Sequence, residues 1–286
     1  MLLLFTVKSI NAVIIPEDSI NKKRLTGVLI AETGLYGGSL IGLNELWYKN
    51  YPRSGFHFFD DNREWLQVDK AGHAITGYHL GLLTSDIYQW AGLSEKKSAI
   101  WGSITGFGYL TVIEILDGFS KQWGASTGDL AANTFGTGLF LAQELSWHEQ
   151  RIQLKWSFHL TDYASKKPEL LGHSLPERML KDYNGQTIWL SVNPNSFRTN
   201  SVIPPWLNIA AGYGGSGMIG AEKNPYSFNN IDRYRQYYLS LDLNWRKIPT
   251  QSKTLKFVFK TLSFIKIPFP AIEFSEKGVS GHLLYW

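Results

Sequence analysis

The hydrophobic pattern of this chain changes its period near residue 150, and this change constrains the fold most. Before that point apolar residues recur at helical spacing, whereas residues 151–160 and 236–246 alternate between apolar and polar side chains. A period of two is typical of β-strands with one apolar and one solvated face. The sequence therefore predicts an α+β chain, with helices first and antiparallel strands second.

Four segments of the first half have the features of helices, at about 21–47, 69–93, 95–119 and 127–150. Each has a start signal, and the spacing of Ser126 and Asp129 fits a capping box. An interior glycine costs about 1 kcal/mol relative to alanine, so repeated glycines indicate close helix contacts. Such glycines recur at four-residue spacing, in the pairs Gly38/Gly42, Gly77/Gly81 and Gly102/Gly106. We expect a four-helix bundle with glycine-rich contacts.

Six segments of the second half read as strands, at 151–160, 186–193, 206–213, 236–246, 255–264 and 281–286. Their alternation, their tyrosines and the terminal Trp286 are also features of outer-membrane barrels, but those start at about eight strands. Two architectures stay open, a twisted sheet packed on the bundle and a small open barrel. We divide the chain into an N-terminal tail or signal remnant (1–20), a helical bundle (21–150) and a β-rich region (151–286).

Composition narrows the class of protein. Charged residues make up 18% of the chain and aromatic residues 14%, which excludes a disordered chain. Cysteine is absent, which excludes thiolate metal sites and cysteine nucleophiles. Residues 1–149 carry 11 basic and 15 acidic residues, whereas residues 150–286 carry 17 and 9. The basic half holds no Lys/Arg run longer than two, so we expect a membrane lipid or envelope component as partner, and no nucleic acid.

One helical segment has the character of a membrane helix. Residues 98–116 contain a single charge, at the lower edge of membrane-spanning length. The other three helical segments carry internal acids or histidines. We therefore expect a bundle that touches or partly enters a bilayer.

Polar residues gather at three places in the helical half. They are Asp69, Lys70 and His73; Glu114 and Asp117; and Ser126, Asp129 and Asn133. We expect these side chains to converge between the second, third and fourth helices. Buried groups of this kind specify packing, bind a polar ligand or metal, or perform acid/base chemistry, and the sequence leaves all three open.

Two arrangements of this cluster can be distinguished. A closed structural network would pair Lys70 with Glu114 or Asp117, and Asp129 with Asn133. A catalytic site would use His73 as general acid or base and Lys70 as an anion clamp, with the carboxylates orienting His73 or holding a divalent metal. One histidine among carboxylates suits magnesium better than zinc. The sequence itself requires no cofactor, and it leaves metal binding open.

The order and spacing of these residues resemble a known family. D-K-x-G-H (69–73), E-x-x-D (114–117) and G-x-S-x-x-D-x-x-x-N-x-x-G (124–136) resemble the YfiM-like predicted periplasmic lipoproteins of unknown function. The likeness covers about residues 65–145, and a more distant one is to VanZ-type membrane proteins. It implies a place in the cell envelope, at the periplasmic face or the outer membrane. It implies no reaction, and lipoprotein anchoring is not carried over to a sequence without cysteine.

Two functions follow as expectations. The first is a membrane-associated cell-envelope protein of unassigned activity, with a polar cluster between its helices. The alternative is a metal-assisted or His-based hydrolase or transferase acting on an amphiphilic or phosphorylated envelope substrate, with His73, Glu114 and Asp117 as its catalytic residues. The oligomeric state is left open.

Overall fold

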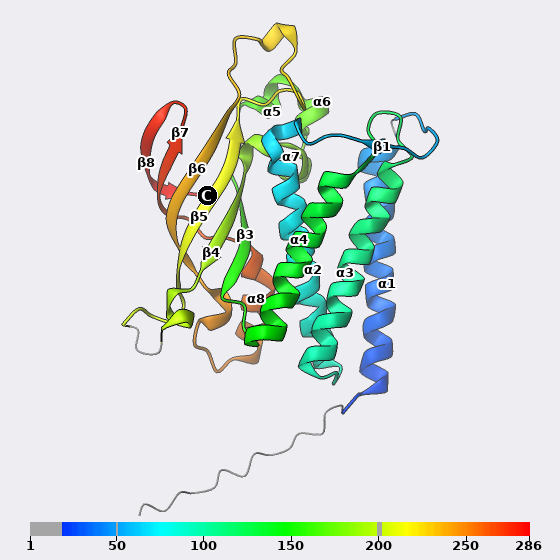
Figure 1. Cartoon of the computed structure of the whole chain (residues 1–286), viewed down its shortest axis with the longest axis vertical. Helices are drawn as coiled ribbons and strands as arrows, with labels where there is room; N and C mark the ends of the chain where they lie inside the picture. Colours follow the sequence, from blue (N-terminus) through cyan, green and yellow to red (C-terminus); the bar gives the residue numbers. More distant parts are fainter. Residues whose placement is uncertain (1–18, 50, 199–201) are drawn as a thin grey trace, which may run out of the picture.

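A computed structural model describes residues 19–49, 51–198 and 202–286. The predicted tail at 1–20 falls almost wholly outside these residues. The predicted bundle is present, and its four helices stand along the long axis of the molecule with α1 outermost (Figure 1). Their bounds are α1 Lys22–Leu43, α2 Val68–Trp90, α3 Glu95–Asp117 and α4 Thr127–Trp147. A π-helical turn, η1 Asn44–Tyr48, follows α1 directly. The predicted helix bounds are thus confirmed to within a few residues.

The second part is one antiparallel sheet with sequential strand order. Its strands are β3 Ile152–Phe158, β4 Gln186–Val192, β5 Leu207–Ser216, β6 Tyr234–Leu243, β7 Phe269–Ser275 and β8 Gly278–Tyr285. Three short helices join β3 to β4: α5 Tyr163–Lys166, α6 Pro168–Leu171 and α7 Leu175–Lys181. Short 3-10 turns complete the loops: η2 Glu64–Gln67, η3 Tyr183–Gly185, η4 Pro194–Phe197, η5 Tyr226–Phe228, η6 Trp245–Lys247 and η7 Leu262–Phe264. The predicted α+β class is confirmed.

One predicted strand is wrong. Residues 255–264 form most of α8 (Lys253–Thr261) and η7, and the sheet takes β7 from the segment that follows. Ser252 caps α8 by accepting a hydrogen bond from the Leu255 N–H at 3.3 Å. Lysines at 253, 256 and 260 share one helix face, so the segment is amphipathic with a helical period as well as with a period of two.

Close helix contacts explain two of the three glycine pairs. The central helix α2 packs against both α3 and α4. A Cβ on Gly102 of α3 would lie 2.7 Å from the carbonyl oxygen of Gly81 in α2. On the other side, a Cβ on Gly136 of α4 would lie 1.8 Å from the carbonyl oxygen of Ala74. These backbones approach so closely that only glycine fits.

The third glycine pair has a different environment. A Cβ on Gly38 or Gly42 of α1 would have no neighbour within 4 Å in residues 19–49, 51–198 and 202–286. Only Val28 of α1 is buried, while Ile30 and Leu35 are 69% and 72% exposed. The expectation of a close helix contact is therefore wrong for this pair, and most of the apolar surface of α1 is uncovered.

The bundle and the sheet share one core. Tyr78 of α2 and Phe140 of α4 pack with Leu154 of β3 and Ile188 of β4. His79 of α2 adds a hydrogen bond of 2.6 Å to the Leu154 carbonyl oxygen. The helices thus cover the apolar face of the sheet at its first strands.

The sheet curls back on its polar face. The ring of Tyr285, at the end of β8, lies 4.3 Å from that of Tyr238 in β6, and its hydroxyl is 3.0 Å from Thr187 Oγ1 in β4. The ring of His159, just after β3, is 5.7 Å from Tyr285, so the two ends of the sheet meet. The curled sheet combines the two predicted architectures, since it packs on the bundle and also encloses an interior.

This curl buries the face that the sequence predicts to be solvated. Lys155 and Asp242 are fully buried and form an ion pair of 2.7 Å. Ser191 donates a hydrogen bond of 2.6 Å to Asp242, and it accepts one of 2.8 Å from Asn208. The prediction of a wet polar face is therefore wrong, because the curl buries these groups, which pair with one another inside the sheet.

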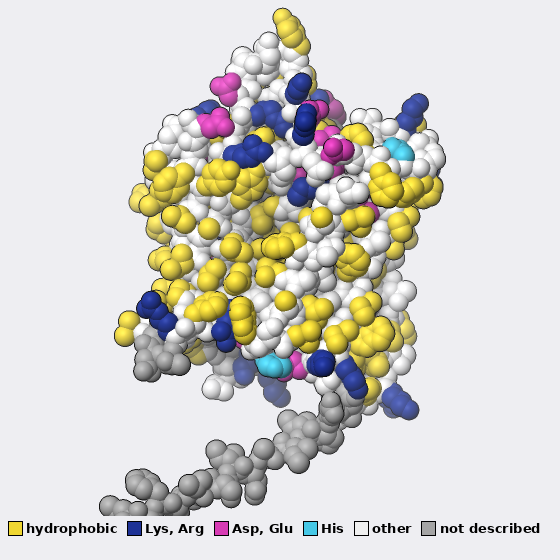
Figure 2. Space-filling model, in the orientation of Figure 1, with side chains coloured by type: hydrophobic (Ala, Val, Ile, Leu, Met, Phe, Trp, Pro, Cys, Tyr) yellow, Lys and Arg dark blue, Asp and Glu magenta, His cyan; other side chains and the backbone are white. Residues whose placement is uncertain are grey.

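The opposite face of the sheet is apolar and exposed beyond the helices. Along β6, Tyr237, Leu239 and Leu241 are 44–51% exposed, whereas Tyr238 and Ser240 between them are buried. Figure 2 shows hydrophobic side chains across the middle of one face of the molecule, with most charged side chains at its upper and lower ends. The outward face of the sheet thus presents an apolar surface that the helices leave uncovered.

Candidate functional site

The predicted polar residues meet at one end of the bundle, where α2 and α4 begin and α3 ends. A short parallel pair, β1 Phe58–Phe59 with β2 Ala125–Ser126, holds the preceding loop against the start of α4. Ser126 caps α4, because its Oγ accepts a hydrogen bond from the Asp129 N–H at 3.0 Å. The same hydroxyl donates to Asp61 at 2.6 Å. The predicted cap is confirmed, and it also ties the loop to the cluster.

Lys70 lies among three aspartates. Its Nζ is 2.6 Å from Asp61, 3.0 Å from Asp69 and 3.0 Å from Asp129. The predicted pairing of Lys70 with Glu114 or Asp117 is therefore wrong. Sequence reasoning missed Asp61, which lies in a loop, where no helical spacing connects it to Lys70.

His73 and Glu114 form the second part of the cluster. His73 Nδ1 is 3.1 Å from Asn133 Oδ1, 3.8 Å from Glu114 Oε1, and its Nε2 is 3.7 Å from Asp129 Oδ1. Glu114 is 2% exposed; its Oε2 accepts a hydrogen bond of 3.0 Å from the Ser126 N–H. Asn133 therefore bonds to His73, and the predicted contact between Asp129 and Asn133 is replaced by this one.

Asp117 faces a different neighbour. It lies one turn after Glu114, but it accepts a hydrogen bond of 2.6 Å from the indole N–H of Trp123. We therefore assign it to the wall beside the cluster.

The chain enters α2 through a left-handed turn. Trp65, Leu66 and Gln67 have φ values of 48°, 51° and 63°, a conformation that costs roughly 1–2 kcal/mol for each non-glycine residue. The loop before β6 holds the turn, since the Trp65 N–H donates to the Ala221 carbonyl at 2.8 Å. Arg235 of β6 also donates to Gln67 Oε1. The sheet thus fixes the position from which Asp69 and Lys70 project.

Electrostatics differ between the two acids that precede α2. Burial alone would raise the pKa of Asp61, but hydrogen bonds from Lys70 and Ser126 and the charge of Lys70 lower it below its ordinary value. Burial and the charges of Asp61 and Asp69 raise the pKa of Glu64 to about 6. Burial, with a smaller contribution from the neighbouring aspartates, therefore makes the ionised form of Glu64 unfavourable.

Two groups of side chains in the cluster have the geometry to hold a metal ion. One ligand atom from each of His73, Glu114 and Asp129 lies within 4.8 Å of the others, and the same holds for Asp61, Asp69 and Asp129. The ammonium of Lys70 already contacts all three aspartates of the second group. In the first group Lys70 contacts Asp129 alone, so the first group is the better candidate for a cation.

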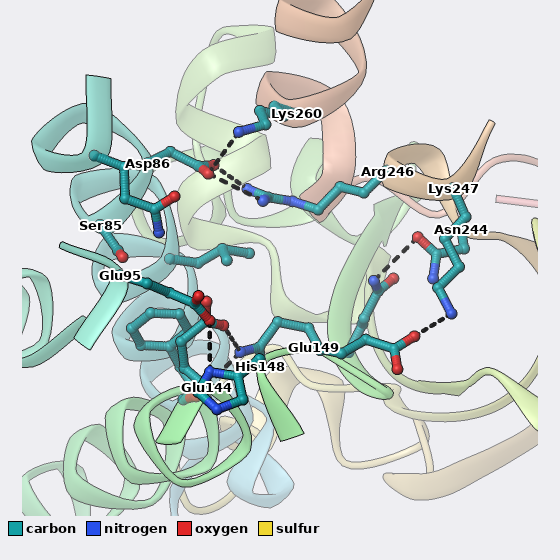
Figure 3. Close-up of a pocket in the computed structure, with 15 residues that line it drawn as sticks. Ser85, Asp86, Glu95, Glu144, His148, Glu149, Asn244, Arg246, Lys247 and Lys260 are labelled. Carbon is teal, nitrogen blue, oxygen red and sulfur yellow. Dashed lines mark hydrogen bonds and ion pairs between the residues drawn. The ribbon is translucent and has the colours of Figure 1, made fainter. Parts of the chain in front are cut away.

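A second polar site lies at the opposite end of the bundle. A cavity of about 300 Å³ separates α2 and α4 from the segment after β6. Figure 3 shows Asp86 facing Arg246 and Lys260, and Glu149 facing Lys247. Because these charges neutralise one another, we assign this cavity a structural role in holding the bundle to the sheet.

Comparisons with known proteins agree with the predicted resemblance. No curated protein and no solved structure matched this chain. A family model does match the segment that holds the cluster, and the description of that family agrees with the predicted location at the periplasmic face of the cell envelope. The more distant VanZ-type likeness stays a prediction. Residues 55–143, from the loop before Asp61 to the middle of α4, match the family described as "Predicted periplasmic lipoprotein (DUF2279)".

Proposed function

We propose that this chain is an integral membrane protein of the cell envelope. Its exposed apolar side chains on α3 and on the outer face of the sheet form an apolar belt, and the polar cluster lies at one edge of this belt. The observation that carries the proposal is that the sheet buries its polar face and exposes its apolar face. Lys155, Asp242 and Asn208 are fully buried, while Leu239 and Leu241 on the other face are 50% and 44% exposed. Strands that alternate apolar outside and polar inside are typical of proteins surrounded by lipid.

The third helix supports this proposal. Among the described residues α3 alone passes a test of length and composition for a membrane-crossing helix, with a mean hydropathy of 1.4. The core helix of a soluble protein can pass the same test, but it is mostly buried. Only 33% of the apolar window of α3 is buried. Trp101 and Ile104 are each 52% exposed, so this helix presents its apolar side chains outward.

The charges of the other helices lie near the helix ends. Residues 71–85 of α2, 98–113 of α3 and 130–143 of α4 contain no Asp, Glu, Lys or Arg. Exposed aromatic residues lie near both limits of these segments, with Phe56 and Phe58 at one end and Trp90 and Trp147 at the other. Aromatic residues at two levels flanking an apolar belt are typical of membrane–water interfaces.

Two further features are compatible with a position in a lipid bilayer. The amphipathic helix α8 presents Leu255 and Phe257, which are 46% and 70% exposed, and carries three lysines on its other face. Basic amphipathic helices of this kind bind at anionic membrane surfaces. A cavity of about 620 Å³ between α1 and α2 is lined mainly by apolar side chains, including Val28, Leu35 and Leu83. Its chemistry suits an acyl chain.

The hydrolase or transferase stays a prediction. As general base, His73 would need a hydrogen bond to the reacting group and a partner to orient its ring. Asn133 supplies that orienting bond, and the neighbouring carboxylate oxygens lie at 3.7 and 3.8 Å. This geometry is compatible with acid/base chemistry, but it identifies no substrate.

The proposal is tested by a pair of lysine substitutions at equally exposed positions. Ile104 is 52% exposed in the middle of the uncharged part of α3, and Leu180 is 50% exposed in α7 beside Arg178 and Lys181. A lysine at the centre of a membrane helix costs about 2.5–3.5 kcal/mol. We expect Ile104→Lys to reduce strongly the fraction of the chain that resists carbonate extraction from membranes, and Leu180→Lys to leave it unchanged.

Two results would contradict membrane insertion. One is release of the unmodified chain by carbonate, and the other is equal behaviour of the two lysine variants. Flotation of the purified chain with lipid vesicles checks the same point without other envelope proteins. Failure to float would mean that the apolar belt is covered by protein instead of lipid.

A further inference from the structure

We propose that His73, Glu114 and Asp129 form a binding site for a divalent cation of the hard, oxygen-preferring class, represented by Mg²⁺ and Mn²⁺. The site lies between α2, α3 and α4. It goes beyond membrane insertion and does not depend on it. The argument rests on a buried carboxylate oxygen without a hydrogen-bond partner, on the orientation of the His73 ring and on the local balance of charge.

Glu114 carries the first step. Its side chain is almost completely buried, and its Oε2 accepts the hydrogen bond from Ser126. The other oxygen, Oε1, has no hydrogen-bond partner among the described residues and lies 3.8 Å from His73 Nδ1. A buried polar atom without a partner costs roughly 1–3 kcal/mol, and more when it is charged. A cation held by Glu114 together with His73 and Asp129, whose ligand atoms all lie within 4.8 Å of one another, would remove this cost.

The His73 ring is oriented to bind a cation. Asn133 is fully buried, and its Oδ1 can only accept the hydrogen bond from His73 Nδ1. This bond places the proton on Nδ1 and leaves the lone pair on Nε2, which lies 3.7 Å from Asp129 Oδ1. A hydrogen bond that fixes one ring nitrogen while the other binds the ion is typical of histidine metal ligands.

Charge balance gives the third step. Lys70 faces Asp61, Asp69 and Asp129, and in the part of the chain that the structure describes it forms no ion pair with Glu114. One ammonium is thus set against four carboxyl groups, while the neutral tautomer of His73 adds no charge. A divalent cation beside Glu114 and Asp129 would offset most of the excess. Two carboxylates and one imidazole favour Mg²⁺ or Mn²⁺ over ions that select thiolates.

The test measures Mn²⁺ binding to the full chain purified in detergent. Electron paramagnetic resonance of free Mn²⁺ reports the bound fraction, and added Mg²⁺ should displace the ion. We expect one Mn²⁺ per chain, and at least tenfold weaker binding in Glu114→Gln and in His73→Ala. Glu95→Gln, at the other end of α3, removes a carboxylate from the same helix and should bind Mn²⁺ like the unmodified chain.

A thermal measurement separates a ligand from a merely structural residue. Glu114→Gln removes a buried negative charge, so we expect the metal-free variant to unfold at the same or a higher temperature than the unmodified chain. Mn²⁺ should raise the unfolding temperature of the unmodified chain but not that of the variant. His73 is the most exposed of the three ligands, with 27% of its side chain accessible, so His73→Ala is the second variant should Glu114→Gln fail to fold.

Three results would overturn the proposal. They are no saturable Mn²⁺ binding to the unmodified chain, binding in Glu114→Gln and His73→Ala that is as tight as in the unmodified chain, or the same loss of binding in Glu95→Gln. Because binding is measured in detergent, these results are independent of the extraction and flotation experiments.

Discussion

At the scale of single residues, the charged groups of the polar cluster differ in how many partners of opposite charge they have. Lys70 has three carboxylate partners within 3.0 Å, whereas Glu114 leaves one buried oxygen without a hydrogen bond. A network built for stability would distribute its partners more evenly, because an unpaired buried charge is costly. Lys70 thus supplies positive charge to one part of the cluster, whereas Glu114 has no lysine or arginine partner among the described residues.

Glu64 allows the cost of ionising a carboxyl group at this end of the bundle to be measured. Its pKa is about 6 in the folded chain against an ordinary value of 4.5. The folded state therefore binds the proton more tightly than the unfolded chain, so stability falls as pH rises from about 4.5 to 6. We expect Glu64→Gln to raise the free energy of unfolding at pH 7.5 by about 1 kcal/mol, allowing for solvent screening of this half-buried group.

Chemical denaturation at a series of pH values checks this prediction. The difference between Glu64→Gln and the unmodified chain should disappear below pH 4.5, where Glu64 is protonated in both states. Glu45→Gln is the control, since its carboxylate is exposed and pairs with Lys49 on the surface, and it should change stability by at most about 0.5 kcal/mol. A pH-independent gain in Glu64→Gln would show that negative charge is not its cause.

At the scale of elements, glycine has two different uses in this bundle. A Cβ on Gly136 would lie 1.8 Å from a backbone oxygen of α2, whereas one on Gly38 would meet nothing. We expect Gly136→Ala to destabilise the chain by about 1–3 kcal/mol, because α2 and α4 must move apart. Gly38→Ala should instead stabilise it by up to about 1 kcal/mol, as expected for an open site in a helix interior.

Thermal unfolding of the two alanine variants decides the point. Opposite shifts in unfolding temperature are expected from the same chemical change. If both variants were stabilised, the contact between Gly136 and Ala74 would be looser than the structure has it.

The elements that sequence predicts well are those whose signals are local. Ser126 and Asp129 mark the start of α4, and Gly92 and Gly118 lie at or just after the ends of α2 and α3. The strand predicted at 255–264 is wrong because the pattern of these residues also fits a helix with its lysines on one face. The loop that brings Asp61 to Lys70 has no local signal at all, since the contact depends on the β1–β2 pair formed in the folded chain.

The candidate site was predictable as a set of residues, but its pairing was not. Helical spacing indicates that Asp69 and His73 share a face, and that Asp129 and Asn133 share another. It carries no information on the rotation of one helix against the next, which the contact at Gly136 fixes. Lys70 therefore turns toward Asp129, and Asn133 turns toward His73.

At the scale of the whole molecule, alternation in a sequence predicts two faces but not which one is inside. The pattern of β6 would be the same in a soluble sheet with its leucines buried. Here the curl of the sheet encloses Asp242 and Ser240 and leaves Leu239 and Leu241 outside. An exposed apolar face of this kind is stable in lipid but not in water, so the thickness of the bilayer should affect the stability of the chain.

The height of the apolar belt predicts the bilayer that suits this chain. The uncharged part of α3, residues 98–113, extends over about 24 Å at 1.5 Å per residue. This is less than the roughly 30 Å hydrocarbon core of an average bilayer and close to the roughly 25 Å apolar band of outer-membrane proteins.

We expect the unfolding temperature in vesicles to be highest with short acyl chains and to fall as the acyl chains lengthen, since each Å of mismatch costs a fraction of a kcal/mol. Measurement of the unfolding temperature across a series of phosphatidylcholines of increasing acyl length tests this, with the same chain in detergent as reference. An unfolding temperature that ignores acyl length would indicate a belt outside the bilayer, whereas a maximum in thick bilayers would mean that the charged ends of α3 are also drawn into the membrane.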